Sequence, residues 1–72
     1  MSEKMSNLMH FAEACFNQNS LNELKYSLKG AADETDLLIW NLTEAEWREA
    51  LKIAVIAMEQ DISVEEAARQ IH

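Results

Sequence analysis

Proline is absent from the 72 residues, and Gly30 is the only glycine. Both residue types favour turns and interrupt regular structure, so this chain has little material for the tight turns of a β-rich fold. Long apolar runs are also missing. The longest, residues 53–58, is far shorter than the ~20 residues that a membrane-spanning helix needs. These absences favour a helical chain that has no membrane among its partners.

Cysteine occurs once, at Cys15, so an internal disulfide is excluded. The two histidines, His10 and His72, are scattered relative to it, and no spacing matches a zinc site. We therefore expect no metal and no cofactor. The first residues also lack the apolar core of a signal peptide, and an unpaired cysteine is typical of a reducing compartment. The sequence thus predicts a cytoplasmic protein.

Basic residues are few in this chain. Six Lys and Arg residues stand against 13 Asp and Glu residues, which leaves a net charge of −7. This charge repels nucleic acid and anionic lipid at long range, and the sequence has no basic stripe for contacts with phosphates. We therefore expect no direct binding of nucleic acid.

The length of the chain limits its core. Seventy-two residues make a single helical domain, 1–72. A chain of this size buries only ~60% of the surface that its unfolded form exposes. Without a disulfide or a metal, association with a partner subunit is the most economical additional source of stability. We therefore expect a homodimer that also binds another protein.

Residues 43–60 carry the longest uninterrupted helical pattern. Thr43 and Glu46 have the spacing of a capping box, in which each side chain accepts a hydrogen bond from the backbone N–H of the other. Leu42 and Trp47 have the spacing of a hydrophobic staple. The apolar stripe that follows is wider than the ~100° of an ordinary surface helix. Such a helix must be covered from at least two sides.

Two further capping boxes indicate other helices. Ser20 with Glu23 begins one helix, and Ser63 with Glu66 begins the last one. Gly30 can end the former helix in the left-handed conformation, which glycine adopts without steric cost. Ala31 and Ala32 could instead carry that helix one turn further.

Residues 33–41 are harder to interpret. An acidic cluster precedes four apolar residues, 37–40, and periodicity cannot distinguish a short buried helix from a strand. No partner strand is visible, so we expect a short helix or an extended linker that places Trp40 in the core. With a first helix over residues 3–18, the predicted fold is all-α: a small compact bundle of three to five helices around a central helix, residues 43–60.

The last twelve residues, from Asp61 to His72, resemble the first helix of a helix-turn-helix unit, in which a Ser-capped helix with a Glu-Ala-Ala core precedes the turn. The resemblance implies a recognition helix beyond it, and the sequence ends where that helix would follow. An ordinary capped amphipathic helix is the interpretation we prefer, because the chain is acidic.

Enzymatic activity is not expected. Cys15 lies beside the apolar face of its helix, and His10 lies on the opposite face, so the two side chains do not converge. No nucleophile, base and oxyanion donor occur together.

The function that we predict is that of a small acidic, non-catalytic protein-interaction module that regulates another protein by binding it. Ile56 is informative because helical geometry points it away from the Trp47 stripe, toward a second surface. Tryptophans are favoured as interface anchors. The candidate partner contacts are Ile56, Trp40, Trp47 and Ile53.

An alternative function is acidic mimicry, of the kind found in phages and mobile elements. Carboxylates placed like phosphates would inhibit a nucleic-acid-binding protein, although a charged surface also serves solubility alone. The candidate acidic face comprises Asp33, Glu34, Asp36, Glu44, Glu46 and Glu49.

Overall fold

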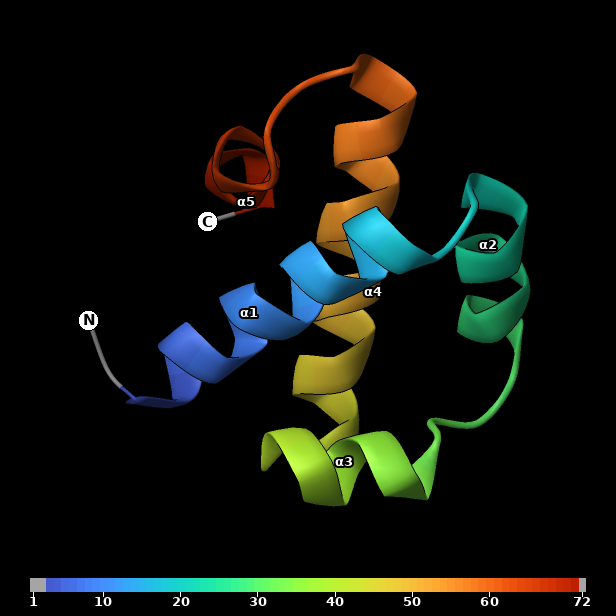
Figure 1. Cartoon of the computed structure of the whole chain (residues 1–72), viewed down its shortest axis with the longest axis vertical. Helices are drawn as coiled ribbons and strands as arrows, with labels where there is room; N and C mark the ends of the chain where they lie inside the picture. Colours follow the sequence, from blue (N-terminus) through green and yellow to red (C-terminus); the bar gives the residue numbers. More distant parts are fainter. Residues whose placement is uncertain (1–2, 72) are drawn as a thin grey trace.

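The computed structural model describes the backbone of residues 3–71 and the side chains of residues 6–71. These residues form five helices and no strand (Figure 1). The prediction of an all-α bundle of three to five helices around residues 43–60 is confirmed. The helices are α1 (Glu3–Gln18), α2 (Leu21–Lys29), α3 (Glu34–Trp40), α4 (Glu44–Gln60) and α5 (Val64–Ile71).

Helix α4 is the centre of the bundle. All four other helices contact it, and α1 and α5 also contact each other. Figure 1 shows α1 crossing α4 near its middle, α2 beside it, and α3 across its N-terminal end. A wide apolar stripe on α4 explains this arrangement, because one neighbouring helix cannot cover it.

The start of α4 forms as the sequence predicts. The Thr43 hydroxyl accepts a hydrogen bond from the Glu46 N–H at 3.2 Å, and the Glu46 carboxylate accepts one from the Thr43 N–H at 2.8 Å. Leu42 and Trp47, the predicted staple, are both buried in the core. The helix ends at Asp61, which adopts the left-handed conformation with φ 55°.

Helix α2 begins with the predicted Ser20–Glu23 capping box, whose two hydrogen bonds measure 3.2 and 2.8 Å. Its end differs from the prediction. Gly30 has φ −105° and is extended, so the expectation of a left-handed glycine is wrong. The Gly30 N–H instead donates to Ser27 at 3.2 Å, and the extended backbone carries the chain away toward α3.

Residues 33–41 form a short helix, so neither a strand nor a fully extended linker is present there. The Asp33 carboxylate caps α3 by accepting a hydrogen bond from the Thr35 N–H at 2.9 Å. Asn41 ends the helix with φ 53°, a conformation that Asn tolerates better than most residues. Trp40 is half-buried, with its ring centroid 5.4 Å from that of Phe11. It therefore packs at the edge of the core.

The core consists of fifteen buried apolar residues, and the described side chains include no buried polar or charged residue. Alanines are frequent where helices meet, and Ala12, Ala50, Ala54, Ala57 and Ala67 are all 0% exposed. Small side chains let neighbouring backbones approach closely, so a short chain covers α4 from several sides. The remaining buried residues are Leu8, Phe11, Cys15, Leu24, Leu42, Trp47, Leu51, Ile53, Val64 and Ala68.

This packing bears on the expected homodimer, which was inferred from the short chain without a disulfide or a metal and from the wide apolar stripe of the central helix. Four helices of the same chain contact α4, where Trp47, Leu51 and Ile53 are buried while Ile56 and Met58 stay half-buried. One chain thus covers much of the stripe by itself, and the homodimer stays a prediction. Within residues 3–71, no helix is both long enough and apolar enough to cross a membrane.

Candidate functional site

Two of the four predicted partner contacts are core residues. Trp47 is 3% exposed and Ile53 is 0% exposed, so both are covered by other parts of this chain, and their role in partner contact stays a prediction. Trp47 was chosen because tryptophans are favoured as interface anchors, and both residues belong to the wide apolar stripe of α4, which four helices contact. Ile56 and Trp40 are half-buried and pack against the core while keeping part of their surface accessible.

Two of the four large apolar side chains that are exposed among the described residues lie on α3. Leu38 is 83% exposed and Ile39 is 71% exposed, and α3 has no fully buried residue. Asp36 and Trp40, one turn apart, are turned toward the core, where they contact Trp47 and Phe11. Leu38 lies opposite them, and Ile39 lies on the flank between the two faces. We call Leu38 and Ile39 together the α3 apolar pair. Elsewhere Tyr26 is 79% exposed and Ile71 is 40% exposed, but neither has an equally exposed large apolar neighbour in sequence.

The exposure of the α3 apolar pair was not predicted, because residues 37–40 were interpreted as one buried run. Helical geometry could have indicated the exposure of Leu38. Once the segment is taken as a helix with Trp40 inward, the 100° step per residue places Leu38 on the opposite face.

The predicted acidic face has a structural role in this fold. Asp33 caps α3 and Glu46 caps α4. Carboxylates in the first turn of a helix are stabilised by the backbone dipole, and the first turns of α3 and α4 each hold two acidic residues. Two of the six carboxylates of the predicted face therefore cap helices.

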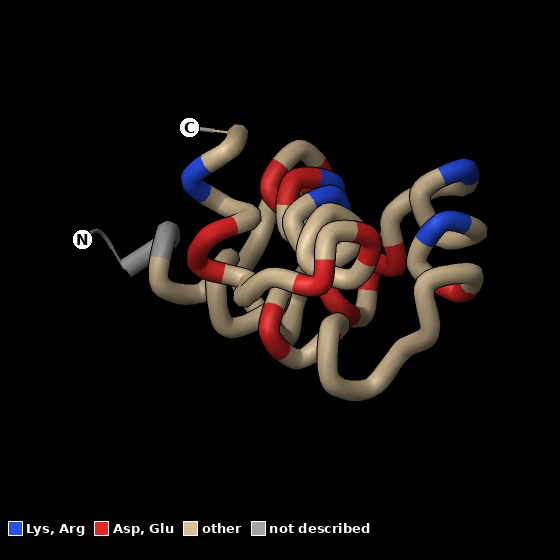
Figure 2. Tube along the Cα trace, turned by 90° about the horizontal axis from the view of Figure 1, so that it is seen from above, with Lys and Arg blue, Asp and Glu red and all other residues tan. Residues whose placement is uncertain are grey.

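Two other members of that face bind side chains of α4. The Asp36 carboxylate accepts a hydrogen bond from the Trp47 indole N–H at 3.4 Å. Glu44 forms an ion pair with Arg48 at 3.4 Å. Glu34 is exposed on the first turn of α3, and Glu49 is half-buried. The six carboxylates are thus distributed over two helix starts and their flanks, and Figure 2 shows acidic positions spread over several parts of the trace.

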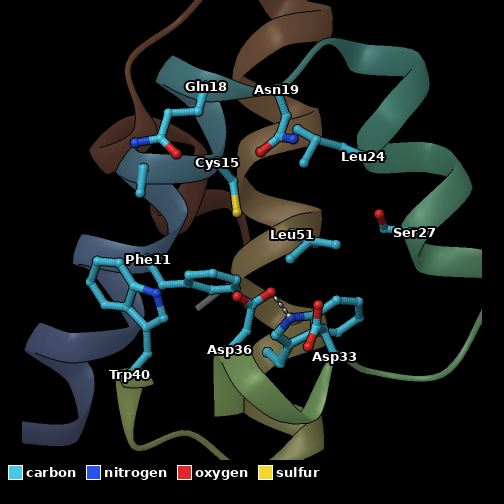
Figure 3. Close-up of a pocket in the computed structure, with 12 residues that line it drawn as sticks. Phe11, Cys15, Gln18, Asn19, Leu24, Ser27, Asp33, Asp36, Trp40 and Leu51 are labelled. Atoms are coloured by element: carbon cyan, nitrogen blue, oxygen red, sulfur yellow. Dashed lines mark hydrogen bonds between the residues drawn. The ribbon is translucent and has the colours of Figure 1, made fainter. Parts of the chain in front are cut away.

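A cavity of about 370 Å³ opens between α1, α2, α3 and α4 (Figure 3). Its volume is within the range of small-molecule sites. Apolar and polar side chains both line it, and none of its lining residues is Lys, Arg or His. The lining residues are Phe11, Ala14, Cys15, Gln18, Asn19, Leu24, Ser27, Asp33, Asp36, Trp40, Trp47 and Leu51.

Cys15 is one of the residues that line this cavity. Burial, with a further contribution from the negative charge of Asp36, raises the pKa of its thiol from 9.0 to about 11. The thiol is therefore protonated at neutral pH, and a protonated thiol is a poor nucleophile. No group of three or more His, Cys, Asp or Glu side chains among the described residues is arranged to hold a metal ion.

This raised pKa predicts a pH dependence of stability. The unfolded thiol ionises near pH 9 and the folded thiol only near pH 11, so the folded state holds its proton more tightly. The contribution of the protonated thiol to the free energy of unfolding is therefore complete below pH 9. It is lost as the pH rises from 9 to 11. We expect the urea midpoint of the wild type to fall more steeply over this interval than that of Cys15→Ala. A difference between the two proteins that does not change with pH would contradict the assignment.

Comparison of the chain with protein-family models, curated proteins and solved structures finds no match. Functional proposals therefore depend on the residues of this chain alone. Two features stand out from the helical scaffold: the α3 apolar pair on the outer face of α3, and the cavity on its inner face.

Proposed function

We propose that the chain is a non-catalytic interaction module that regulates another protein by binding it through α3. The observation that carries the proposal is the α3 apolar pair, two adjacent large side chains that are 83% and 71% exposed. Single exposed apolar residues are common and need no explanation. Leu38 and Ile39 point about 100° apart around the axis of one ordered helix. Together they offer two adjoining strips of apolar surface, and protein interfaces bury such side chains at their centre.

Helix α3 is held in place before any partner arrives. Asp33 caps its first turn, and the Leu42 N–H donates to the Leu37 carbonyl at 3.0 Å just beyond its end. On its inner face, Asp36 is hydrogen-bonded to Trp47, and the Trp40 ring packs against Phe11. A surface that is already ordered loses less conformational entropy on binding, which favours recognition.

The charges around the pair indicate the chemistry of the partner. Helix α3 has acidic residues in its first turn, Glu34 and Asp36, and no basic residue in its last turn. Glu44 and Glu46 follow at the start of α4. The expected partner therefore has an apolar groove with basic residues at its rim. A second copy of this chain, with its own charge of −7, fits this requirement less well than a different protein.

A photo-crosslinking residue at position 38 tests the proposal in the native host. We expect a discrete adduct with a different protein whose apolar groove has a basic rim. The same residue at position 26, which is also exposed and apolar but lies on α2, is the matched control and should give no such adduct. Equal adducts from both positions, or an adduct of two copies of this chain, would overturn the proposal.

Replacing both members of the pair separates binding from folding. Because both side chains are mainly exposed, Leu38→Gln with Ile39→Gln should leave the melting temperature within a few degrees of the wild type. Affinity for the crosslinked partner, measured by calorimetry, should fall by at least about tenfold, which corresponds to roughly 1.4 kcal/mol. Tyr26→Gln is the matched control. Unchanged affinity in the double variant would contradict a role for the pair.

Acidic mimicry predicts a different pattern in the same measurements. A mimic would tolerate loss of the α3 apolar pair but would lose affinity when exposed carboxylates are neutralised, as in Glu34→Gln with Glu44→Gln. The observed use of Asp33 and Glu46 as helix caps gives mimicry less support than binding through the pair.

A further inference from the structure

We propose that the cavity between α1, α2, α3 and α4 binds a small organic cation, an ammonium group carried on an apolar body. This site lies on the inner face of α3, opposite Leu38, and does not depend on the function proposed above. Figure 3 shows the lining side chains, which come from all four helices and the segments next to them.

The charge of the lining selects the sign of the ligand. Asp33 and Asp36 both border the cavity, and no Lys, Arg or His side chain lines it. Arg48 follows the lining residue Trp47 in sequence. Its guanidinium already donates hydrogen bonds to the carbonyls of Leu28 and Gly30 and to the Glu44 carboxylate. A cation entering the cavity therefore meets two carboxylates without a competing positive side chain in the wall.

The polar groups of the lining leave room for a donor from the ligand. Asp36 uses one carboxylate oxygen, Oδ2, for the Trp47 indole N–H, while a carboxylate offers about four lone-pair sites in all. Burial keeps the Cys15 thiol protonated, with its pKa at about 11, so the sulfur remains neutral beside Asp36. Gln18 and Asn19 in the lining supply further polar contacts.

The apolar part of the lining suits the body of such a ligand. Trp40 is half-buried, one helical turn from Asp36, and its ring packs against Phe11 at 5.4 Å between centroids with an angle of 49°. The faces of aromatic rings attract cations, and indole does so most strongly. An ammonium group near Asp36 would thus have a carboxylate and an indole as neighbours, and the carbon skeleton would contact the apolar wall.

A nuclear magnetic resonance titration with three probes of similar shape tests the proposal. The probes are phenethylamine, which is a cation at neutral pH, the neutral 2-phenylethanol, and the anion phenylacetate. Trp40 and Trp47 are the only tryptophans in the chain, and both line the cavity, so the two indole N–H signals report directly on its occupancy. We expect saturable shifts of these signals with phenethylamine and none with phenylacetate.

Variants that remove charge but keep hydrogen bonds make the test specific. Asp33→Asn with Asp36→Asn keeps a good helix cap and an acceptor for Trp47, so it should fold while weakening phenethylamine binding by at least about tenfold. Glu34→Gln with Glu65→Gln removes the same charge from exposed positions outside the cavity and should bind as the wild type does. Equal binding of the neutral probe, equal loss in the control variant, or no saturable shift would each overturn the proposal.

Discussion

The Trp47→Ala variant is expected to be unfolded at room temperature or to melt far below the wild type. Trp47 is 3% exposed in the first turn of α4, where it packs in the core together with Leu42 and Leu51. Truncating a buried Trp costs ~3–5 kcal/mol. At ~0.05–0.15 kcal/mol per residue, a chain of this length has a total stability of roughly 4–11 kcal/mol. The loss is therefore a large part of the whole.

Thermal melting followed by circular dichroism measures this effect. Tyr26→Ala is the matched control, because Tyr26 is also aromatic and helical but is 79% exposed, and we expect it to melt as the wild type does. A cooperative transition of Trp47→Ala within a few degrees of the wild type would show that the bundle is not organised around the start of α4.

Arg48→Met is expected to have the second largest effect. The guanidinium of Arg48 donates to the Leu28 carbonyl at 2.9 Å and to the Gly30 carbonyl at 2.6 Å, both at the C-terminal end of α2. Its charged group also lies 5.8 Å from the centroid of the Trp47 ring. Hydrogen bonds from a charged donor contribute ~1.5–3 kcal/mol, so the variant should lose stability by about this amount.

Urea unfolding gives the size of this loss, and amide hydrogen exchange gives its location. We expect faster exchange in α2, because Arg48 is the residue of α4 that holds the end of α2 by hydrogen bonds to its carbonyls. Lys52→Met is the matched control, since Lys52 is an exposed basic residue one turn further along α4. Equal urea midpoints for the two variants would contradict the role given to Arg48.

The helix starts were predictable because their signals are local. Each capping box needs only residues i and i+3, and the boxes at Ser20 and Thr43 form as expected. The hydroxyl of Ser63 likewise accepts a hydrogen bond from the Glu66 N–H at 3.1 Å. Gly30 was mispredicted because its conformation depends on a distant residue as well: Arg48, 18 positions away, binds its carbonyl.

The candidate site was less predictable for the same reason. Composition shows how much apolar surface a chain has, but the direction of each side chain on a seven-residue helix depends on what packs against that helix. Trp40 and Asp36 are turned toward α1 and α4, and this leaves Leu38 outside. The cavity joins residues of four helices, and no spacing along the sequence indicates it.

Sedimentation velocity over a range of micromolar concentrations tests the central claim most directly. That claim is that one chain covers its own central helix and keeps the α3 apolar pair for a different protein. It predicts a single monomeric species at every concentration, at low and at high salt, for the wild type and for Leu38→Gln with Ile39→Gln alike. A dimer that grows with concentration and salt, and that the double variant abolishes, would contradict the claim and assign the pair to a second copy of this chain.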